Sequence, residues 1–167
     1  MRIAITGSTG LIGTALSEHL VRAGHEVVPV VRNVPRPGEI GWDPSAGRLE
    51  AADLAGLDAI VHLAGAGIGD RRWTDEYKRV LLDSRVDGTT LIAERMAELG
   101  DGAPRTLVSG SAIGFYGDRG DEVLDESSAI GEGFLAEICH RWESATAPAE
   151  AAGVRVVHIR TGIVLTP

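Results

Sequence analysis

Close to its N-terminus the chain reads Arg2-Ile3-Ala4-Ile5-Thr6-Gly7-Ser8-Thr9-Gly10-Leu11-Ile12-Gly13, an apolar run followed by three glycines at a three-residue spacing. The short, β-branched run over residues 3–5 is typical of a strand that is buried on both faces. After the glycines, apolar residues return at helical intervals, at positions 12, 16 and 20. The stretch therefore predicts a strand, a tight turn and a helix.

The three glycines suit a turn that binds phosphate. Gly7 lets the backbone leave the strand sharply, Gly10 removes the Cβ that would keep a pyrophosphate off the backbone, and Gly13 lets the helix lie close to the strand. The start of the helix then presents free N–H groups and a partial positive charge. A plain strand-to-helix turn is the alternative. If the stretch is a dinucleotide site, we expect the following residues to bind the cofactor: Thr6, Gly7, Ser8, Thr9, Gly10, Leu11, Ile12 and Gly13.

The residue that follows the second predicted strand is Arg32, nineteen positions after Gly13. An acidic residue near this position would hold the ribose 2′-hydroxyl of NAD, whereas an arginine suits the 2′-phosphate of NADP. We therefore expect NADP(H) to be favoured over NAD(H). The alternative is a solvated arginine at the end of a strand.

Strand and helix patterns alternate along the rest of the chain, which predicts a single domain over residues 1–167. Its class is α/β: a Rossmann-type, doubly wound, mainly parallel sheet in three layers, α/β/α. Pro148 is expected to kink or restart the last helix. After the first strand we expect a helix at about 11–22, and then strands at 25–31, 57–65, 106–109 and 154–159. Further helices are expected at 74–100, with Thr74 as the N-cap, and at 134–152.

Small residues follow two of these strands. Ligands of doubly wound sheets bind at the carboxyl ends of the strands. We therefore expect the dinucleotide to pass close to Leu63, Ala64 and Gly65 in one segment and to Ser109 and Gly110 in the other. The preceding His62 lies inside an apolar run, where a hydrogen-bonded core histidine is favoured over a ligand or a catalytic group.

Composition places the chain among ordinary globular proteins, because 44% of its 167 residues are hydrophobic and 24% are charged. A net charge of −8 argues against nonspecific binding to nucleic acid or to acidic membranes.

The single cysteine, Cys139, cannot form an internal disulfide and is expected in the core. With neither a leader pattern nor an apolar run of membrane length, we expect a cytoplasmic protein. The acidic string at 118–126 lacks a spaced ligand loop and predicts a solvated surface, not a metal site.

Several motifs together resemble the extended short-chain dehydrogenase/reductase superfamily of NAD(P)-dependent epimerases, dehydratases and reductases. They are Thr6–Gly13, His62-Leu63-Ala64-Gly65 and Ser111–Gly117. A further set is similar to an atypical epimerase-family branch whose members are commonly labelled nucleotide-sugar epimerases: Arg72-Trp73-Thr74, Lys78, Ser84-Arg85, Ser109–Gly120, Phe134–Glu137, Trp142-Glu143 and Arg160–Leu165. Members usually continue well past this length. The resemblance implies that a C-terminal, substrate-binding segment is missing from this chain, and it leaves a homodimer open.

The chain departs from the superfamily at the catalytic pair, a tyrosine followed four residues later by a lysine that lowers the pKa of the phenol. The only tyrosines are Tyr77 and Tyr116, and the positions four residues later hold Leu81 and Gly120. The single lysine is Lys78. In addition, the helical asparagine of the superfamily corresponds to an arginine, at position 85.

Two hypotheses follow. In the first, the protein is an NADP(H)-binding oxidoreductase or epimerase-like enzyme that acts on a small molecule, and Ser111 and Tyr116 polarise a substrate carbonyl or hydroxyl. Lys78 and Arg85 are seven residues apart on one predicted helix, where they either bind an anionic substrate group or are solvated. Gly162 completes the candidate substrate residues. In the second hypothesis, favoured by the loss of the catalytic pair, the chain is a non-catalytic NADPH sensor or a protein-interaction module.

Overall fold

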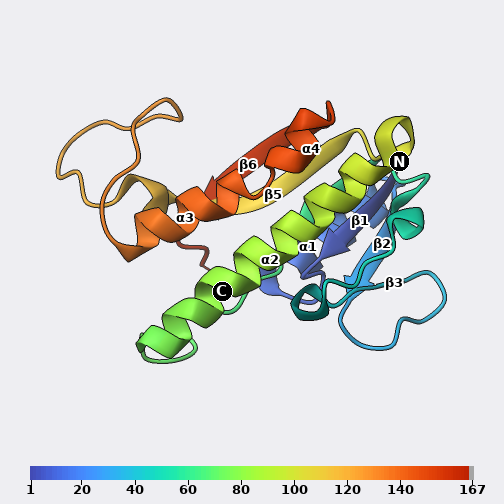
Figure 1. Cartoon of the computed structure of the whole chain (residues 1–167), viewed down its shortest axis with the longest axis horizontal. Coiled ribbons are helices and arrows are strands. Elements are labelled where there is room, and N and C mark those ends of the chain that lie inside the picture. The colour runs from blue at the N-terminus through green and yellow to red at the C-terminus, as the bar shows by residue number, and fades with distance from the viewer. Residues whose placement is uncertain (166–167) are drawn as a thin grey trace.

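The computed structural model describes residues 1–165 and contains a six-stranded sheet in which all neighbouring strands are parallel. The strand order is β3-β2-β1-β4-β5-β6, so the chain begins in the interior of the sheet and winds outward in both directions (Figure 1). The predicted Rossmann-type class is confirmed. The strands are β1 (Arg2–Thr6), β2 (Glu26–Val31), β3 (Ile40–Gly41), β4 (Ala59–His62), β5 (Thr106–Ala112) and β6 (Arg155–Thr161).

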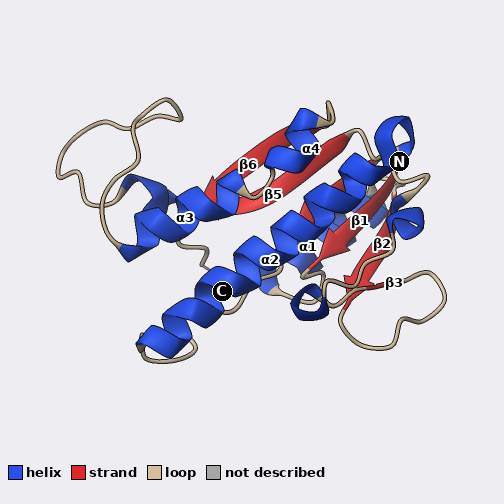
Figure 2. Cartoon of the chain, viewed as in Figure 1, coloured by secondary structure: helices blue, strands red, loops and turns tan. Residues whose placement is uncertain are grey.

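Helices lie on both faces of the sheet (Figure 2). On one face Ile3 and Ile5 of β1 form a core cluster with Leu16, and on the other Ala4 belongs to a larger cluster with Met96. Because alternate residues of a strand face opposite sides, β1 is buried by both layers, and the domain has the predicted three layers. The helices are α1 (Leu11–Arg22), α2 (Asp75–Leu99), α3 (Phe134–Ser144) and α4 (Ala147–Ala151).

Helix α2 is positioned by its N-cap residue and by one glycine. The Thr74 hydroxyl accepts a hydrogen bond from the Tyr77 N–H at 3.2 Å, which caps the helix as its sequence predicts. Near the middle, a Cβ on Gly88 would lie 3.2 Å from the Trp42 ring and 3.3 Å from the His62 ring. Gly88 therefore lets α2 lie close to the sheet.

The helix expected at 134–152 and the strand expected at 106–109 differ from their expected limits. The predicted helix at 134–152 is divided into α3 and α4, and Pro148 is the second residue of α4, where its missing N–H has no intrahelical partner to lose. β5 extends to Ala112 instead of ending at residue 109, because β6 pairs with it as far as Thr161. Ser109, Gly110 and Ser111 thus belong to a strand. None of the helices in residues 1–165 combines the length and apolar character needed to cross a membrane.

Candidate functional site

The Gly-rich turn joins β1 to α1 in a conformation that depends on its glycines. Gly7 has a φ of +68°, a left-handed conformation that favours glycine, and its carbonyl accepts a hydrogen bond from the Gly10 N–H at 3.0 Å. A Cβ on Gly13 would lie 2.1 Å from the Gly7 oxygen, so α1 can start this close only with glycine there. The N-cap of α1 is Gly10, which has no side chain to cap the helix. The N–H groups of the first turn are therefore available to an anion.

Thr6 holds the loop that follows β4 against this turn. Its hydroxyl accepts hydrogen bonds from the backbone N–H groups of Leu63, at 3.1 Å, and Ala64, at 3.2 Å. It also lies 2.6 Å from Nδ1 of His62, which is fully buried and hydrogen-bonded, as expected for a core histidine. A Cβ on Gly7 would approach the Ala64 nitrogen to 3.0 Å. The turn and the β4 loop thus form one continuous backbone surface at the carboxyl end of the sheet.

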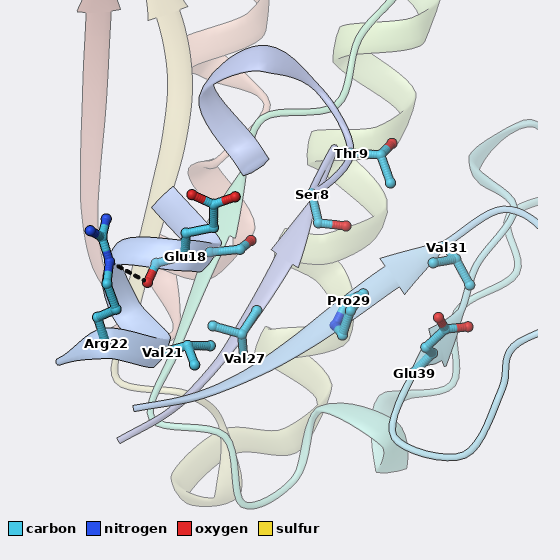
Figure 3. Close-up of a pocket in the computed structure, with 10 residues that line it drawn as sticks. Ser8, Thr9, Glu18, Val21, Arg22, Val27, Pro29, Val31 and Glu39 are labelled. Atoms are coloured by element: carbon cyan, nitrogen blue, oxygen red, sulfur yellow. Dashed lines mark hydrogen bonds between the residues drawn. The ribbon is translucent and has the colours of Figure 1, made fainter. Parts of the chain in front are cut away.

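A groove of about 740 Å³ lies beside the turn, between α1 and β2 (Figure 3). Ser8 and Thr9 line it at the turn, and Val31 and Glu39 line it where β2 ends. Within the described chain, residues 32–39 join β2 to β3 without a helix, which leaves this face of β2 open. Arg32 follows Val31 directly and is exposed. The structure therefore brings the Gly-rich turn and the segment leading to Arg32 to one side of the sheet.

Ser111 and Tyr116 belong to one hydrogen-bonded network at the carboxyl end of β5. The Ser111 hydroxyl donates to Glu143 Oε1 at 2.6 Å, and Arg160 donates to both oxygens of that carboxylate at 2.9 Å. The third guanidinium nitrogen of Arg160 donates to the Tyr116 hydroxyl oxygen, also at 2.9 Å. Ser111 and Arg160 are register partners of β5 and β6, while Glu143 comes from α3. Residues from three separate segments of the sequence thus meet at one site.

Charge and stacking hold this network in place. The Arg160 guanidinium lies 3.6 Å from the centroid of the Phe115 ring and 5.0 Å from that of Tyr116. Burial raises the pKa of Glu143, but hydrogen bonds from Arg160 and Ser111 outweigh this and keep the pKa below its ordinary value. Hydrogen bonding to Glu143 raises the pKa of Arg160. Glu143 is therefore a carboxylate and Arg160 a cation at neutral pH.

Sequence reasoning did not assign Glu143 or Arg160 to the site. Both lie in motifs that carried the family resemblance, Trp142-Glu143 and Arg160–Leu165, and this was the available signal. Spacing along the chain does not reveal that Glu143 accepts a hydrogen bond from Ser111, or that Arg160 donates one to Tyr116. The start of α3 itself, at 134–139, offers neither phenol nor ammonium in place of the superfamily pair.

The candidate substrate residues lie in two places. Lys78 and Arg85 share the side of α2 that faces α3, because Lys78 Nζ is 5.5 Å from the Phe134 ring centroid and Arg85 Cζ is 5.1 Å from that of Trp142. Gly162 follows β6, where a Cβ would lie 3.6 Å from the Ile113 side chain. The sequence left open whether these two cations bind an anionic substrate group or are solvated. In the structure each cation is partly packed on an aromatic ring, so neither side chain is fully solvated.

Two further expectations concern residues outside the network. Cys139 is buried, and burial raises the pKa of its thiol, as suits an unreactive core cysteine. The acidic residues between 118 and 126 are exposed, as expected. No group of three or more metal-ligating side chains with the geometry of a metal site occurs among the described residues.

Comparison with known proteins identifies the fold and the family. The model of the NAD dependent epimerase/dehydratase family matches residues 3–160, nearly the whole chain. The chain belongs to this family. Its Gly-rich turn, which leaves room for a phosphate at an uncapped helix start, fits the NAD(P) that the family binds.

Relatives in this family are similar along nearly the whole chain. "Epimerase family protein Mb2239" of Mycobacterium bovis is 43% identical over 99% of this chain and 54% of its own length. The human "epimerase family protein SDR39U1" is 35% identical, with coverages of 99% and 55%. The chain therefore spans about half the length of these relatives.

Solved structures agree with this placement. A crystal structure described as the nucleoside-diphosphate sugar epimerase from Corynebacterium glutamicum has a TM-score of 0.86 and 47% identity, covering 99% of this chain and 34% of that one. The crystal structure of human SDR39U1 (isoform 2), which was determined with NADPH, has a TM-score of 0.85 and 35% identity, with coverages of 99% and 55%. The chain, as a member of the family, is thus an NAD(P)-binding protein with a Rossmann-type fold.

Proposed function

We propose that the protein is an NADP(H)-dependent oxidoreductase or epimerase-like enzyme that acts on a small molecule, with Ser111 and Tyr116 at its reacting centre. The observation that carries the proposal is the network of Ser111, Glu143, Arg160 and Tyr116 at the same end of the sheet as the Gly-rich turn. When bound, the nicotinamide supplies or accepts a hydride. The protein has to orient the substrate oxygen and manage its proton.

The hydrogen-bond directions support different tasks for the two hydroxyls. The Tyr116 oxygen accepts a hydrogen bond from Arg160, so its own proton can be donated to a substrate carbonyl. The Ser111 proton already goes to Glu143, so the remaining capacity of this hydroxyl is that of an acceptor. In the direction of reduction, Tyr116 would give its proton to the carbonyl oxygen of the substrate, and a bound cofactor would supply the hydride. Arg160 is then next to the phenolate oxygen, where the superfamily places a lysine.

Arg32 supports NADP(H) as the preferred cofactor. Its guanidinium is exposed directly after β2, and no ion pair to a carboxylate occupies it in the described part of the chain. An arginine at this point can make charge-assisted hydrogen bonds to a 2′-phosphate. The human relative crystallised with NADPH is in keeping with this choice.

Turnover of NADPH with a panel of aldehydes and ketones tests the proposal. Tyr116→Phe should lower the rate of NADPH oxidation by about a hundredfold or more, as loss of a general acid does, with NADPH affinity unchanged. Tyr77→Phe is the matched control, because the Tyr77 hydroxyl donates to the Gly67 carbonyl, away from Arg160. Equal rates in wild type and Tyr116→Phe would refute the role of Tyr116.

A second function is favoured by one specific observation, the absence of the tyrosine-lysine pair from the sequence. It is an NADPH-binding sensor or interaction module without catalysis. Tight NADPH binding without substrate-dependent oxidation across the panel would support this second function. Any turnover that depends on Tyr116 would exclude it.

A further inference from the structure

Helices α2 and α3 face each other through two cations that lie on two aromatic rings. Lys78 lies on Phe134 and Arg85 lies on Trp142, with cation-to-centroid distances of 5.5 and 5.1 Å. We call these four residues the cationic wall. Seven residues of α-helix separate the two cations, which corresponds to two turns and to about 10 Å along α2. The two positive charges therefore lie on one face of α2, two helical turns apart.

The cations of the wall are not matched by carboxylates. In residues 1–165, no ion pair involves Lys78 or Arg85, although Arg79 on the same helix pairs with Glu76. The chain has 24 acidic residues against 16 Lys and Arg, so acids are not scarce. Arg85 is half-buried, and one of its N–H groups donates to the Leu81 carbonyl at 2.9 Å. A guanidinium has five N–H donors, so most of its capacity is left for an acceptor.

Aromatic faces offset only part of the cost of burying these charges, because a cation–π contact is weaker than a charge-assisted hydrogen bond to an anion. Burial lowers the pKa of Arg85, which means that its charged form is destabilised by its surroundings. An oxyanion placed against the wall would relieve this penalty and would fill the free donors.

The wall borders the carboxyl end of the sheet. A Cβ on Gly65, just after β4, would lie 3.5 Å from Arg85 Cζ, and a Cβ on Gly110 of β5 would lie 2.9 Å from the Trp142 ring. Gly110 precedes Ser111, and Trp142 of the wall precedes Glu143 of the network, so the wall adjoins the hydroxyl network. The Gly-rich turn contacts the same loop at a different place, because Gly7 lies against Leu63 and Ala64 whereas Gly65 lies against Arg85. An anion on Arg85 would thus be close to the reacting centre, separate from the pyrophosphate.

We propose that the cationic wall is an anion subsite for the substrate, which carries a carboxylate or phosphate group that binds Arg85, and that Lys78 extends this subsite along α2. The assignment of the bound anion to a substrate rests on the proposed function. The existence of the subsite does not, because it requires only an oxyanion and the wall.

Titration of the protein with inorganic pyrophosphate, and separately with succinate, tests the subsite at constant ionic strength. The indole of Trp142 lies against Arg85, so its fluorescence reports an anion that binds the guanidinium. We expect a saturable change that disappears in Trp142→Phe. Arg85→Gln should weaken binding about tenfold or more, and Lys78→Gln should weaken it less. The stronger of the two probes distinguishes a phosphate from a carboxylate group.

Arg79→Gln is the matched control, because it removes the same charge from the exposed, acid-paired side of α2. It should bind the probes like wild type. The proposal is overturned by binding that persists in both Arg85→Gln and Lys78→Gln, by an equal loss in Arg79→Gln, or by no saturable signal with either probe. If Arg85→Gln does not fold by circular dichroism, Lys78→Gln and Arg85→Lys decide the outcome.

NADPH affinity, measured in parallel by calorimetry, separates this inference from the proposed function. Arg85→Gln should bind NADPH as wild type does. Competition between the probes and NADPH at the wall would show that Arg85 serves the cofactor, and would overturn its assignment to substrate. A protein that binds the probes through Arg85 and yet fails to bind NADPH would contradict the proposed function alone.

Discussion

Acid should destabilise this protein through one buried side chain, His62. Burial lowers the pKa of His62 from 6.5 to about 4. The Thr6 hydroxyl oxygen already accepts two backbone N–H groups, so we assign its proton to Nδ1 of a neutral His62 ring. On the other side of the ring, Nε2 is buried without a hydrogen-bond partner in the described structure. A proton added to Nδ1 would break the bond to Thr6 and leave an unpaired charge in the core.

The size of the effect follows from proton linkage. An unfolded histidine binds protons more readily than the buried one, so unfolding takes up a proton below about pH 6.5. The stability contributed by neutral His62 is complete above this pH and is lost as the pH falls toward about 4. With these two pKa values the loss is about 2 kcal/mol at about pH 5, and about 3 kcal/mol once both states are protonated.

Urea unfolding at about pH 7.5 and about pH 5 measures this loss as a change in the free energy of unfolding. His62→Asn is the informative variant, because its amide oxygen can accept the Thr6 proton and does not titrate. Its stability should fall by about 2 kcal/mol less than that of wild type between the two pH values. The control His140→Gln removes an exposed histidine and should keep the wild-type pH dependence. Equal pH dependence in wild type and His62→Asn would refute the reasoning.

Two further predictions concern the cofactor end of the domain. Arg32→Ala should weaken NADPH binding by about tenfold to a hundredfold and leave NADH binding unchanged, because a charged hydrogen bond contributes about 1.5–3 kcal/mol. Titration of both cofactors checks this, and Arg105→Ala is the control, because Arg105 directly precedes β5 at the opposite end of the sheet. A mutant that keeps its NADPH preference would remove Arg32 from the site. Gly13→Ala should lower the free energy of unfolding by about 1–3 kcal/mol, because its Cβ would meet the Gly7 oxygen at 2.1 Å. Gly10→Ala, whose Cβ would be 3.3 Å from that oxygen, should mainly weaken NADPH binding, and equal destabilisation by the two variants would contradict this assignment.

Local sequence was enough to predict most elements and the Gly-rich turn. α1 begins and ends at the predicted residues, and α2 begins after its predicted cap, Thr74. These features depend on neighbours within a few residues: apolar periodicity, a capping hydroxyl and glycines that permit a sharp turn. The strand that ends at Ala112 was predicted three residues too short, because the extra pairs come from β6, a distant segment.

What the sequence by itself determined is the Rossmann-type class, the Gly-rich turn and the identity of the two candidate hydroxyls, Ser111 and Tyr116. Only the tertiary structure decided what those hydroxyls can do. Glu143 reaches Ser111 from α3, and Arg160 reaches Tyr116 because β6 pairs in register with β5. The physical reason is that hydrogen-bond direction and charge at a site are set by partners brought together by packing and strand register, and these partners can lie anywhere along the chain.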